Sequence, residues 1–287
     1  MQYAAPNKAR RAVELLAGAK GTARVLAGGT DLLVQMKSGM IAPDLLVDIK
    51  NIKDIATIRR GKNGFRIGAA VSCAVLGECA ELVAAWPGVV EAANLIGSTQ
   101  VQGRCTMTGN LCNASPAADS VPALVAADAT ARIIGPDGKR ECPVQDIPTG
   151  PGRTSLAKGE FITALHLPPR PERAGDAYLR FIPRTEMDIA VCSAGVSLTL
   201  DKDGRIATAR VALGAVAPTV LLVNAAAEAI IGSKLDDAAL AALAAACSAA
   251  CQPIDDKRGT IEFRTEVAGV LARRAARIAY TRAGGQA

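Results

Sequence analysis

A strand, two glycines, a helix and a second strand follow one another near the N-terminus and constrain the fold most. Residues 24–27 read as a short buried strand, 28–31 as a turn, 32–37 as a helix and 45–49 as the second strand. Such a βαβ unit joins parallel strands through a right-handed crossover. The pattern therefore predicts a small lobe of mixed helices and parallel strands over about residues 1–53.

The turn of this unit has the composition of an anion site. Gly28 and Gly29 let successive backbone N–H groups face a common space after the strand, which suits a phosphate or pyrophosphate. Thr30 and Asp31 are expected to cap the following helix. The sequence matches neither the dinucleotide pattern GxGxxG nor the P-loop pattern. Taken alone, the turn fits an anion site and an ordinary helix start equally well.

A second cluster of small hydrogen-bonding residues lies within residues 104–128. Small residues permit a close backbone approach, and hydroxyl and amide groups supply directed hydrogen bonds. We expect a loop up to Pro116 and then an apolar helix that ends near residue 127. The loop is either a ligand-contacting segment or a tight connection, and its polar members are Thr106, Thr108, Gly109, Asn110, Asn113 and Ser115.

The rest of the chain predicts an α+β protein with two further regions. A larger mixed lobe over about residues 54–168 would contain strands at 55–59, 65–70, 130–134, 139–142 and 161–167 and helices at 72–83 and 87–96. Three prolines within residues 168–171 indicate a domain boundary. A C-terminal domain at 172–287 would combine a hairpin of strands 189–200 and 205–216 with helices at 224–231, 236–251 and 262–282. On the last helix, the expected apolar side comprises Phe263, Val267, Val270, Leu271 and Ile278.

The net charge of +6 is concentrated near the C-terminus, where residues 257–287 hold seven Lys and Arg but only two Glu. This basic helix could face an acidic partner subunit, nucleic acid or solvent. Because aromatic residues make up only 3% of the chain, we favour a partner subunit over nucleic acid.

Metal ligands and acid–base groups are sparse. The eight cysteines form no C-x2-C pair, and Cys247 and Cys251 read as buried small residues rather than metal ligands. The one histidine, His166, reads as an exposed strand residue. No apolar run reaches the length of a membrane span, no signal-peptide pattern is present, and free thiols fit a reducing compartment. We therefore expect a cytoplasmic protein without metal ligands or catalytic side chains of its own.

Two segments together resemble the paired flavin motifs of the molybdenum hydroxylase family. They are residues 25–32, Val-Leu-Ala-Gly-Gly-Thr-Asp-Leu, and residues 106–119, which begin Thr-Met-Thr-Gly-Asn. The likeness extends to residues 184–190 and 262–274. The chain is similar to the medium, FAD-binding subunit of this family, as in carbon monoxide dehydrogenase and the flavin region of xanthine dehydrogenase.

The resemblance implies a two-lobed FAD domain at residues 1–168, followed by the family's C-terminal domain. The first motif would hold the FAD pyrophosphate, Thr106–Asn110 would meet the flavin side, and Asp119 would accept hydrogen bonds from a cofactor hydroxyl. The implied cofactor-binding residues are Val25, Leu26, Ala27, Gly28, Gly29, Thr30, Asp31, Leu32, Ile96, Thr106, Thr108, Gly109, Asn110, Ser115, Asp119, Ile162 and Arg180.

The same likeness implies two partners: a small subunit with two [2Fe–2S] clusters and a large subunit with the molybdenum cofactor, in a dimer of heterotrimers. Electrons would pass from the clusters through FAD to an external acceptor. A non-redox nucleotide-binding or assembly module with the same fold is the alternative. Cys105 and Thr108 stand where the family usually has glycine; if position 108 needed a positive φ, threonine would be strained there by about 1–2 kcal/mol.

Overall fold

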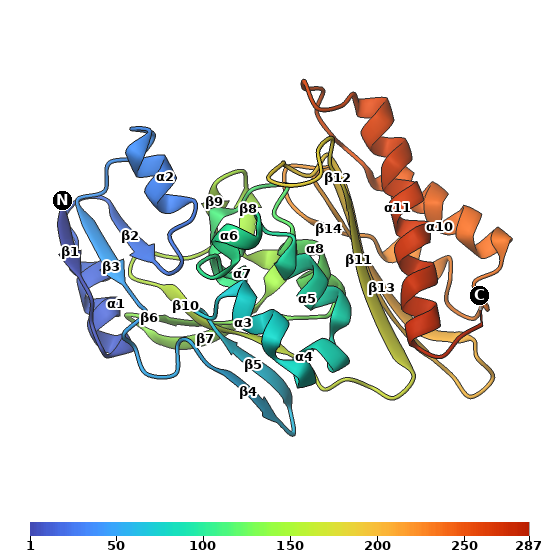
Figure 1. Cartoon of the computed structure of the whole chain (residues 1–287), viewed down its shortest axis with the longest axis horizontal. Helices are drawn as coiled ribbons and strands as arrows, with labels where there is room; N and C mark the ends of the chain where they lie inside the picture. The colour runs from blue at the N-terminus through green and yellow to red at the C-terminus, as the bar shows by residue number, and fades with distance from the viewer. Residues whose placement is uncertain (287) are drawn as a thin grey trace.

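The N-terminal lobe contains the expected βαβ unit. The computed structural model describes residues 1–286, and this lobe lies at one end of the molecule, in blue (Figure 1). Its sheet is parallel, in the order β1-β3-β2, so the β2–α2–β3 prediction is confirmed. Strand β1 was not predicted. The elements are β1 Gln2–Ala4, α1 Ala9–Gly18, β2 Ala23–Leu26, α2 Leu32–Lys37 and β3 Leu45–Asp48.

The middle lobe is built on an antiparallel sheet in the order β4-β5-β10-β6-β7. Its strands are β4 Ile58–Gly61, β5 Gly64–Gly68, β6 Thr130–Gly135, β7 Gly138–Pro143 and β10 Phe161–Leu167. Its helices are α3 Cys73–Glu78, α4 Ala80–Ala85, α5 Pro87–Asn94, α6 Thr99–Gln102, α7 Met107–Asn113 and α8 Ser120–Ala126. The 3-10 turn η1 Val144–Asp146 and the short strands β8 Pro148–Gly150 and β9 Arg153–Thr154 precede β10.

Two local predictions in this lobe are wrong. The single helix expected at 72–83 is two helices, because Cys79 leaves the helical conformation with φ −81° and ψ 88°. The loop expected up to Pro116 contains the helix α7. The Thr106 side chain accepts a hydrogen bond from the Gly109 N–H and so caps this helix at its N-terminus.

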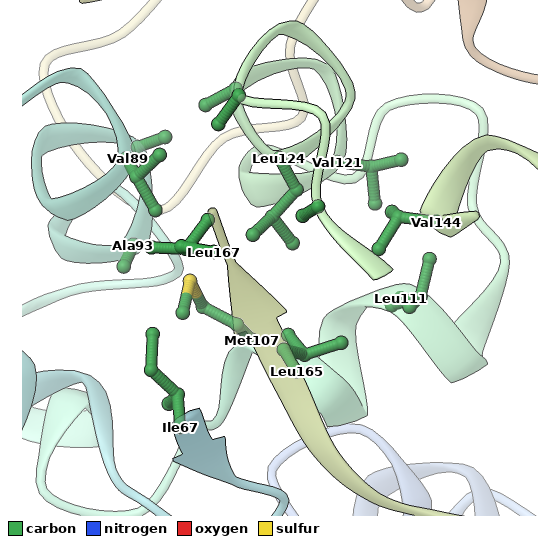
Figure 2. Packing of buried hydrophobic residues seen from close by; sticks show 14 of the residues in the cluster. Ile67, Val89, Ala93, Met107, Leu111, Val121, Leu124, Val144, Leu165 and Leu167 are labelled. Carbon is green, nitrogen blue, oxygen red and sulfur yellow. The ribbon is translucent and has the colours of Figure 1, made fainter. Parts of the chain in front are cut away.

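The core of the middle lobe holds α7 rigidly against the sheet. Figure 2 shows Met107 and Leu111 of α7 among apolar side chains of β5, β10, α5 and α8. Met107 is 2% exposed and Leu111 is 0% exposed. Because interiors pack at crystal-like density, a helix with two such side chains has little freedom to shift.

The C-terminal part, at the far end of the molecule, is an antiparallel sheet in the order β11-β12-β13-β14 (Figure 1). Helix α11 packs on β11 and β12, and α10 packs against α11. The elements are β11 Ala174–Phe181, β12 Cys192–Leu200, β13 Ile206–Gly214, β14 Leu221–Leu222, α9 Asn224–Glu228, α10 Asp237–Ala250 and α11 Ile261–Arg282. Helices α5 and α8 of the middle lobe also contact this sheet. Strands β11 and β14 were not predicted. The predicted α+β fold, a small βαβ lobe and a larger mixed lobe followed by this part, is confirmed.

Glycines allow helix backbones to lie directly on this sheet. A Cβ at Gly175 would lie 1.8 Å from the Ala279 carbonyl oxygen of α11, and one at Gly195 would lie 2.7 Å from the Pro122 carbonyl oxygen of α8. The face of α11 turned to the sheet is correspondingly small. Its fully buried positions include Ala268, Ala272, Ala275, Ala276 and Ala279.

The predicted apolar side of α11 is confirmed only in part. Leu271 is buried, and Val267 and Ile278 are partly buried against the same core, but Phe263 is 37% exposed. The periodicity of the larger apolar residues does not include these alanines. The close approach of helix and sheet is what makes alanine the residue that fits.

Among residues 1–286, no helix is long and apolar enough to cross a membrane. The same residues contain no group of three His, Cys, Asp or Glu side chains that could hold a metal ion. All eight cysteines are free thiols.

Candidate functional site

A cleft of about 890 Å³ opens between the N-terminal lobe and the middle lobe. Its walls come from the β2–α2 turn, the start of α7 and the segment before β10. Small-molecule sites commonly occupy about 300–1,000 Å³, so the cleft is large enough for an extended cofactor. Thirteen of the seventeen predicted residues line it: Val25, Ala27, Gly28, Gly29, Thr30, Asp31, Leu32, Ile96, Thr106, Thr108, Gly109, Asn110 and Ile162.

Gly28 is the reason that the two motifs can meet. A Cβ on Gly28 would lie 2.0 Å from the Arg104 carbonyl oxygen and 3.1 Å from the Cys105 Cα. The backbone of the first motif thus rests directly on the backbone that leads into α7. Any residue larger than glycine would force the two walls of the cleft apart.

The β2–α2 turn presents a row of unused backbone donors. Within the described residues, the N–H groups of Gly28, Gly29, Thr30, Asp31 and Leu32 have no hydrogen-bond acceptor. Gly29 has φ +79°, a conformation that favours glycine. Successive free N–H groups in a turn form a concave anion site. This geometry fits a phosphate or pyrophosphate.

The expected side-chain capping of α2 is wrong. Asp31 is the N-cap residue of α2, but its carboxylate accepts no capping hydrogen bond. It lines the cleft instead, and burial raises the pKa of its carboxyl group. Arg24 and Lys158 also line the cleft and add positive charge to its wall.

A network beneath the turn was missed from sequence. The Lys50 ammonium donates to the Ala27 carbonyl oxygen at 3.1 Å and to the two carboxylate oxygens of Asp48 at 2.8 and 2.7 Å. The Tyr3 hydroxyl donates to the same carboxylate at 2.7 Å. Asp48 is only 7% exposed, and these donors lower the pKa of its carboxyl group despite burial. The network therefore fixes the carbonyl just before the glycines.

A charged pair at the end of strand β3 was the available signal for this network. Asp48 and Lys50 stand at the boundary of an otherwise apolar segment. Their partners Tyr3 and Ala27 are distant in sequence, so the hydrogen bonds could not be assigned from spacing.

The opposite wall is the start of α7. Among the described residues, the Met107 and Thr108 N–H groups have no acceptor. Asn110 lines the cleft, but its Oδ1 accepts hydrogen bonds from the N–H and hydroxyl groups of Ser120, which tie α7 to α8. The Asn113 Oδ1 accepts from Gln35 of α2 at 3.1 Å. Side-chain amides thus link both walls of the cleft.

The substitutions at positions 105 and 108 cause no backbone strain. Thr108 lies within α7 and is absent from the residues with positive φ, so the strain considered from sequence does not arise. Cys105 is 2% exposed and lies beside Cys73, whose thiol hydrogen bond lowers the pKa of Cys105.

Four predicted residues lie outside the cleft lining: Leu26, Ser115, Asp119 and Arg180. Asp119 and Arg180 form a buried ion pair at 2.8 Å that links the middle lobe to β11, and the Tyr178 hydroxyl donates to the same carboxylate at 3.2 Å. Burial raises the pKa of Asp119, against the opposing effect of Arg180. The cofactor roles of these four residues, like those of the thirteen that line the cleft, stay predictions.

The comparisons with known proteins agree with this geometry. Residues 1–170 match the family described as the FAD binding domain in molybdopterin dehydrogenase, and residues 177–279 match the CO dehydrogenase flavoprotein C-terminal domain. The carbon monoxide dehydrogenase medium chain of Afipia carboxidovorans is 34% identical, over 98% of this chain and 97% of the relative. The xanthine dehydrogenase FAD-binding subunit of Escherichia coli O157:H7 is 31% identical, over 96% and 94%.

The fold of this chain also matches that of a solved structure. The carbon monoxide dehydrogenase of Hydrogenophaga pseudoflava, in a form that lacks the Mo-pyranopterin moiety of the molybdenum cofactor, contains a chain that superposes with a TM-score of 0.94. That chain is 32% identical, with 98% of both chains covered. The free N–H groups, the close contact of Gly28 with Arg104 and these matches all point to FAD as the cofactor. The chain belongs to the family of FAD-binding medium subunits of molybdenum hydroxylases and is an oxidoreductase subunit.

Proposed function

We propose that this chain holds FAD in the cleft between its first two lobes and transfers electrons within a heteromeric molybdenum hydroxylase. The observation that carries the proposal is the row of free N–H groups from Gly28 to Leu32, opposite the free N–H groups at the start of α7. The first row would hold the pyrophosphate. Arg24 and Lys158 would add favourable charge for it.

The α7 wall would face the flavin side of the cofactor. Ile96 and Ile162 line the cleft and offer apolar contact to a ring system. Asp119 already accepts hydrogen bonds from Tyr178 and Arg180, but each carboxylate oxygen has a second lone pair for a cofactor hydroxyl. We retain Leu26, Ser115, Asp119 and Arg180 as proposed cofactor-binding residues.

We propose that bound FAD carries the redox chemistry and that the protein supplies position and electrostatics. Electrons would come from [2Fe–2S] clusters of a small partner subunit and leave for an external acceptor. A large partner subunit would hold the molybdenum cofactor and the substrate. The complex would be a cytoplasmic dimer of heterotrimers. Division of this chain into functional units at 1–168 and 172–287 belongs to the same proposal.

Flavin reconstitution tests the proposal directly. The purified chain is expected to take up FAD stoichiometrically and to show a visible flavin band that bleaches with dithionite. When the chain is co-expressed with its partners, substrate should bleach the same band. A chain that takes up no FAD would contradict the cleft assignment.

The alternative, a non-redox nucleotide-binding or assembly module, gives a different result. Such a module would bind an adenine nucleotide in the cleft. No flavin band would bleach when the assembled complex is mixed with substrate or with a reductant of the iron–sulfur clusters. Bleaching at the rate of substrate turnover would reject it.

A further inference from the structure

A second cavity, of about 520 Å³, lies at another junction of the same two lobes. The N-terminal lobe and Ile55, which follows it, contribute part of its wall, and strands β5, β6, β7 and β10 contribute the rest. It shares no lining residue with the cofactor cleft. Its lining is Ala9, Ile52, Lys53, Ile55, Arg66, Arg132, Ile133, Ile134, Lys139, Arg140, Glu141 and Thr163.

The charges around this cavity are unbalanced. Five cationic side chains line it, and Glu141 is its only carboxylate. Arg140 is neutralised elsewhere, because it donates two hydrogen bonds to Glu160 at 2.7 Å. Lys53 and Lys139 form no ion pair with any described residue. At least two exposed positive charges without an ion-pair partner among the described residues therefore lie at the rim of the cavity.

Arg66, which lies within the sheet, adds to this imbalance of charge. Arg66 donates to the Asp54 carbonyl oxygen at 3.1 Å, while the Asp54 carboxylate is engaged by Arg59 at 2.6 Å. Arg59 and Arg66 are directly paired in the β4–β5 register. Burial, and the neighbouring charges of Arg59 and Arg132, lower the pKa of Arg66. A guanidinium in this setting gains from an anion.

Arg132 offers an unused donor. Its Nε lies 3.0 Å from a Glu141 carboxylate oxygen, but the N–H is not aimed at that oxygen. This nitrogen is buried and has no hydrogen-bond acceptor among the described residues. Buried polar atoms usually have a partner, and an anion in the cavity would give this N–H an aligned acceptor that Glu141 does not supply.

We propose that this cavity is a second small-molecule site and that it binds a phosphate ester. Arg66 and Arg132 would bind the phosphate oxygens, as the planar guanidinium group does well. Lys53 and Lys139 would add charge at the rim. Ile52, Ile55 and Ile134 would contact the apolar body of the ligand. The position between two lobes is typical of ligand sites.

Inorganic pyrophosphate serves as the probe, titrated calorimetrically into the FAD-loaded protein at constant ionic strength. The flavin spectrum is recorded throughout, so that the cofactor cleft is known to stay filled. We expect saturable binding to the wild type, and dissociation constants at least tenfold higher for Arg66→Gln and for Arg132→Gln. Thermal unfolding gives a second readout: pyrophosphate should raise the Tm of the wild type and not that of Arg66→Gln.

Arg10→Gln is the matched control. It removes one positive charge from α1 next to Ala9, but the Arg10 side chain is 92% exposed and does not line the cavity. We expect it to bind pyrophosphate like the wild type. Absence of saturable pyrophosphate binding, or an equal loss of affinity in Arg10→Gln, would overturn the proposal. The basic residues around the cavity would then attract anions only through non-specific charge. Neither result would affect the FAD assignment.

Discussion

Replacing Gly28 with alanine is expected to push apart the two walls of the cofactor cleft. The new Cβ would lie 2.0 Å from the Arg104 carbonyl oxygen and 2.7 Å from its carbonyl carbon. Because non-bonded heavy atoms prefer about 3.5–4.0 Å, one backbone must move by roughly 1 Å or more. Overpacking of this kind costs about 1–3 kcal/mol of stability.

The same shift should weaken FAD binding. It moves the free N–H groups of residues 28–32 relative to the α7 wall, so that at least one charge-assisted hydrogen bond to the pyrophosphate is lost. Such a bond contributes about 1.5–3 kcal/mol. The dissociation constant for FAD should therefore rise about 10- to 150-fold.

Titration of apoprotein with FAD, followed by flavin fluorescence, measures this change, and circular dichroism checks that the fold is retained. Gly18→Ala is the control, because no atom lies within 4 Å of the position where its Cβ would be. We expect it to bind FAD like the wild type. Wild-type FAD affinity and stability in Gly28→Ala would refute the reasoning that a direct backbone contact joins the two motifs.

Three further predictions concern other parts of the molecule. Lys50→Met removes the donor to the Ala27 carbonyl and one partner of buried Asp48. The variant should lower the free energy of unfolding by about 1–3 kcal/mol and reduce the FAD content of the purified protein. Unchanged flavin content would show that the network does not hold the turn. Burial raises the pKa of Asp176 from 3.8 to about 6, so the folded protein binds this proton more tightly than the unfolded chain. This contributes up to about 3 kcal/mol of stability below pH 4, and the contribution is lost as the pH rises through 6. Asp176→Asn should flatten that part of the pH–stability curve in urea unfolding, and an unaltered slope would contradict it. The double substitution Arg273→Glu and Arg274→Glu reverses charge on the exposed face of α11 and should reduce co-purification of partner subunits. The control Arg10→Glu should not reduce it. Intact assembly of the double variant would reject a partner contact on this face of α11.

Local pattern predicted much of the fold and part of the site. The β2–α2–β3 unit, the β4–β5 and β12–β13 hairpins and strand β10 depend on short-range periodicity and turn residues, which the sequence displays directly. Gly28 and Gly29 indicate a turn from sequence alone, because glycines after a strand have a clear conformational use. The small polar residues of the second motif predict a loop, because they disfavour a helix in isolation. The Thr106 cap and the burial of Met107 and Leu111 make it a helix instead.

The remaining features depend on contacts between residues far apart in the chain. The sequence by itself determined the β2–α2–β3 unit, the β4–β5 and β12–β13 hairpins, the two glycine-bearing segments and the excess of positive charge. Only the tertiary structure decided that Gly28 touches Arg104, that Lys50 holds Ala27, that alanines form the buried face of α11, and that Arg66 and Arg132 border one cavity. The physical reason is that local periodicity acts over a few residues, whereas close backbone approach and strand register depend on which distant segments pack together.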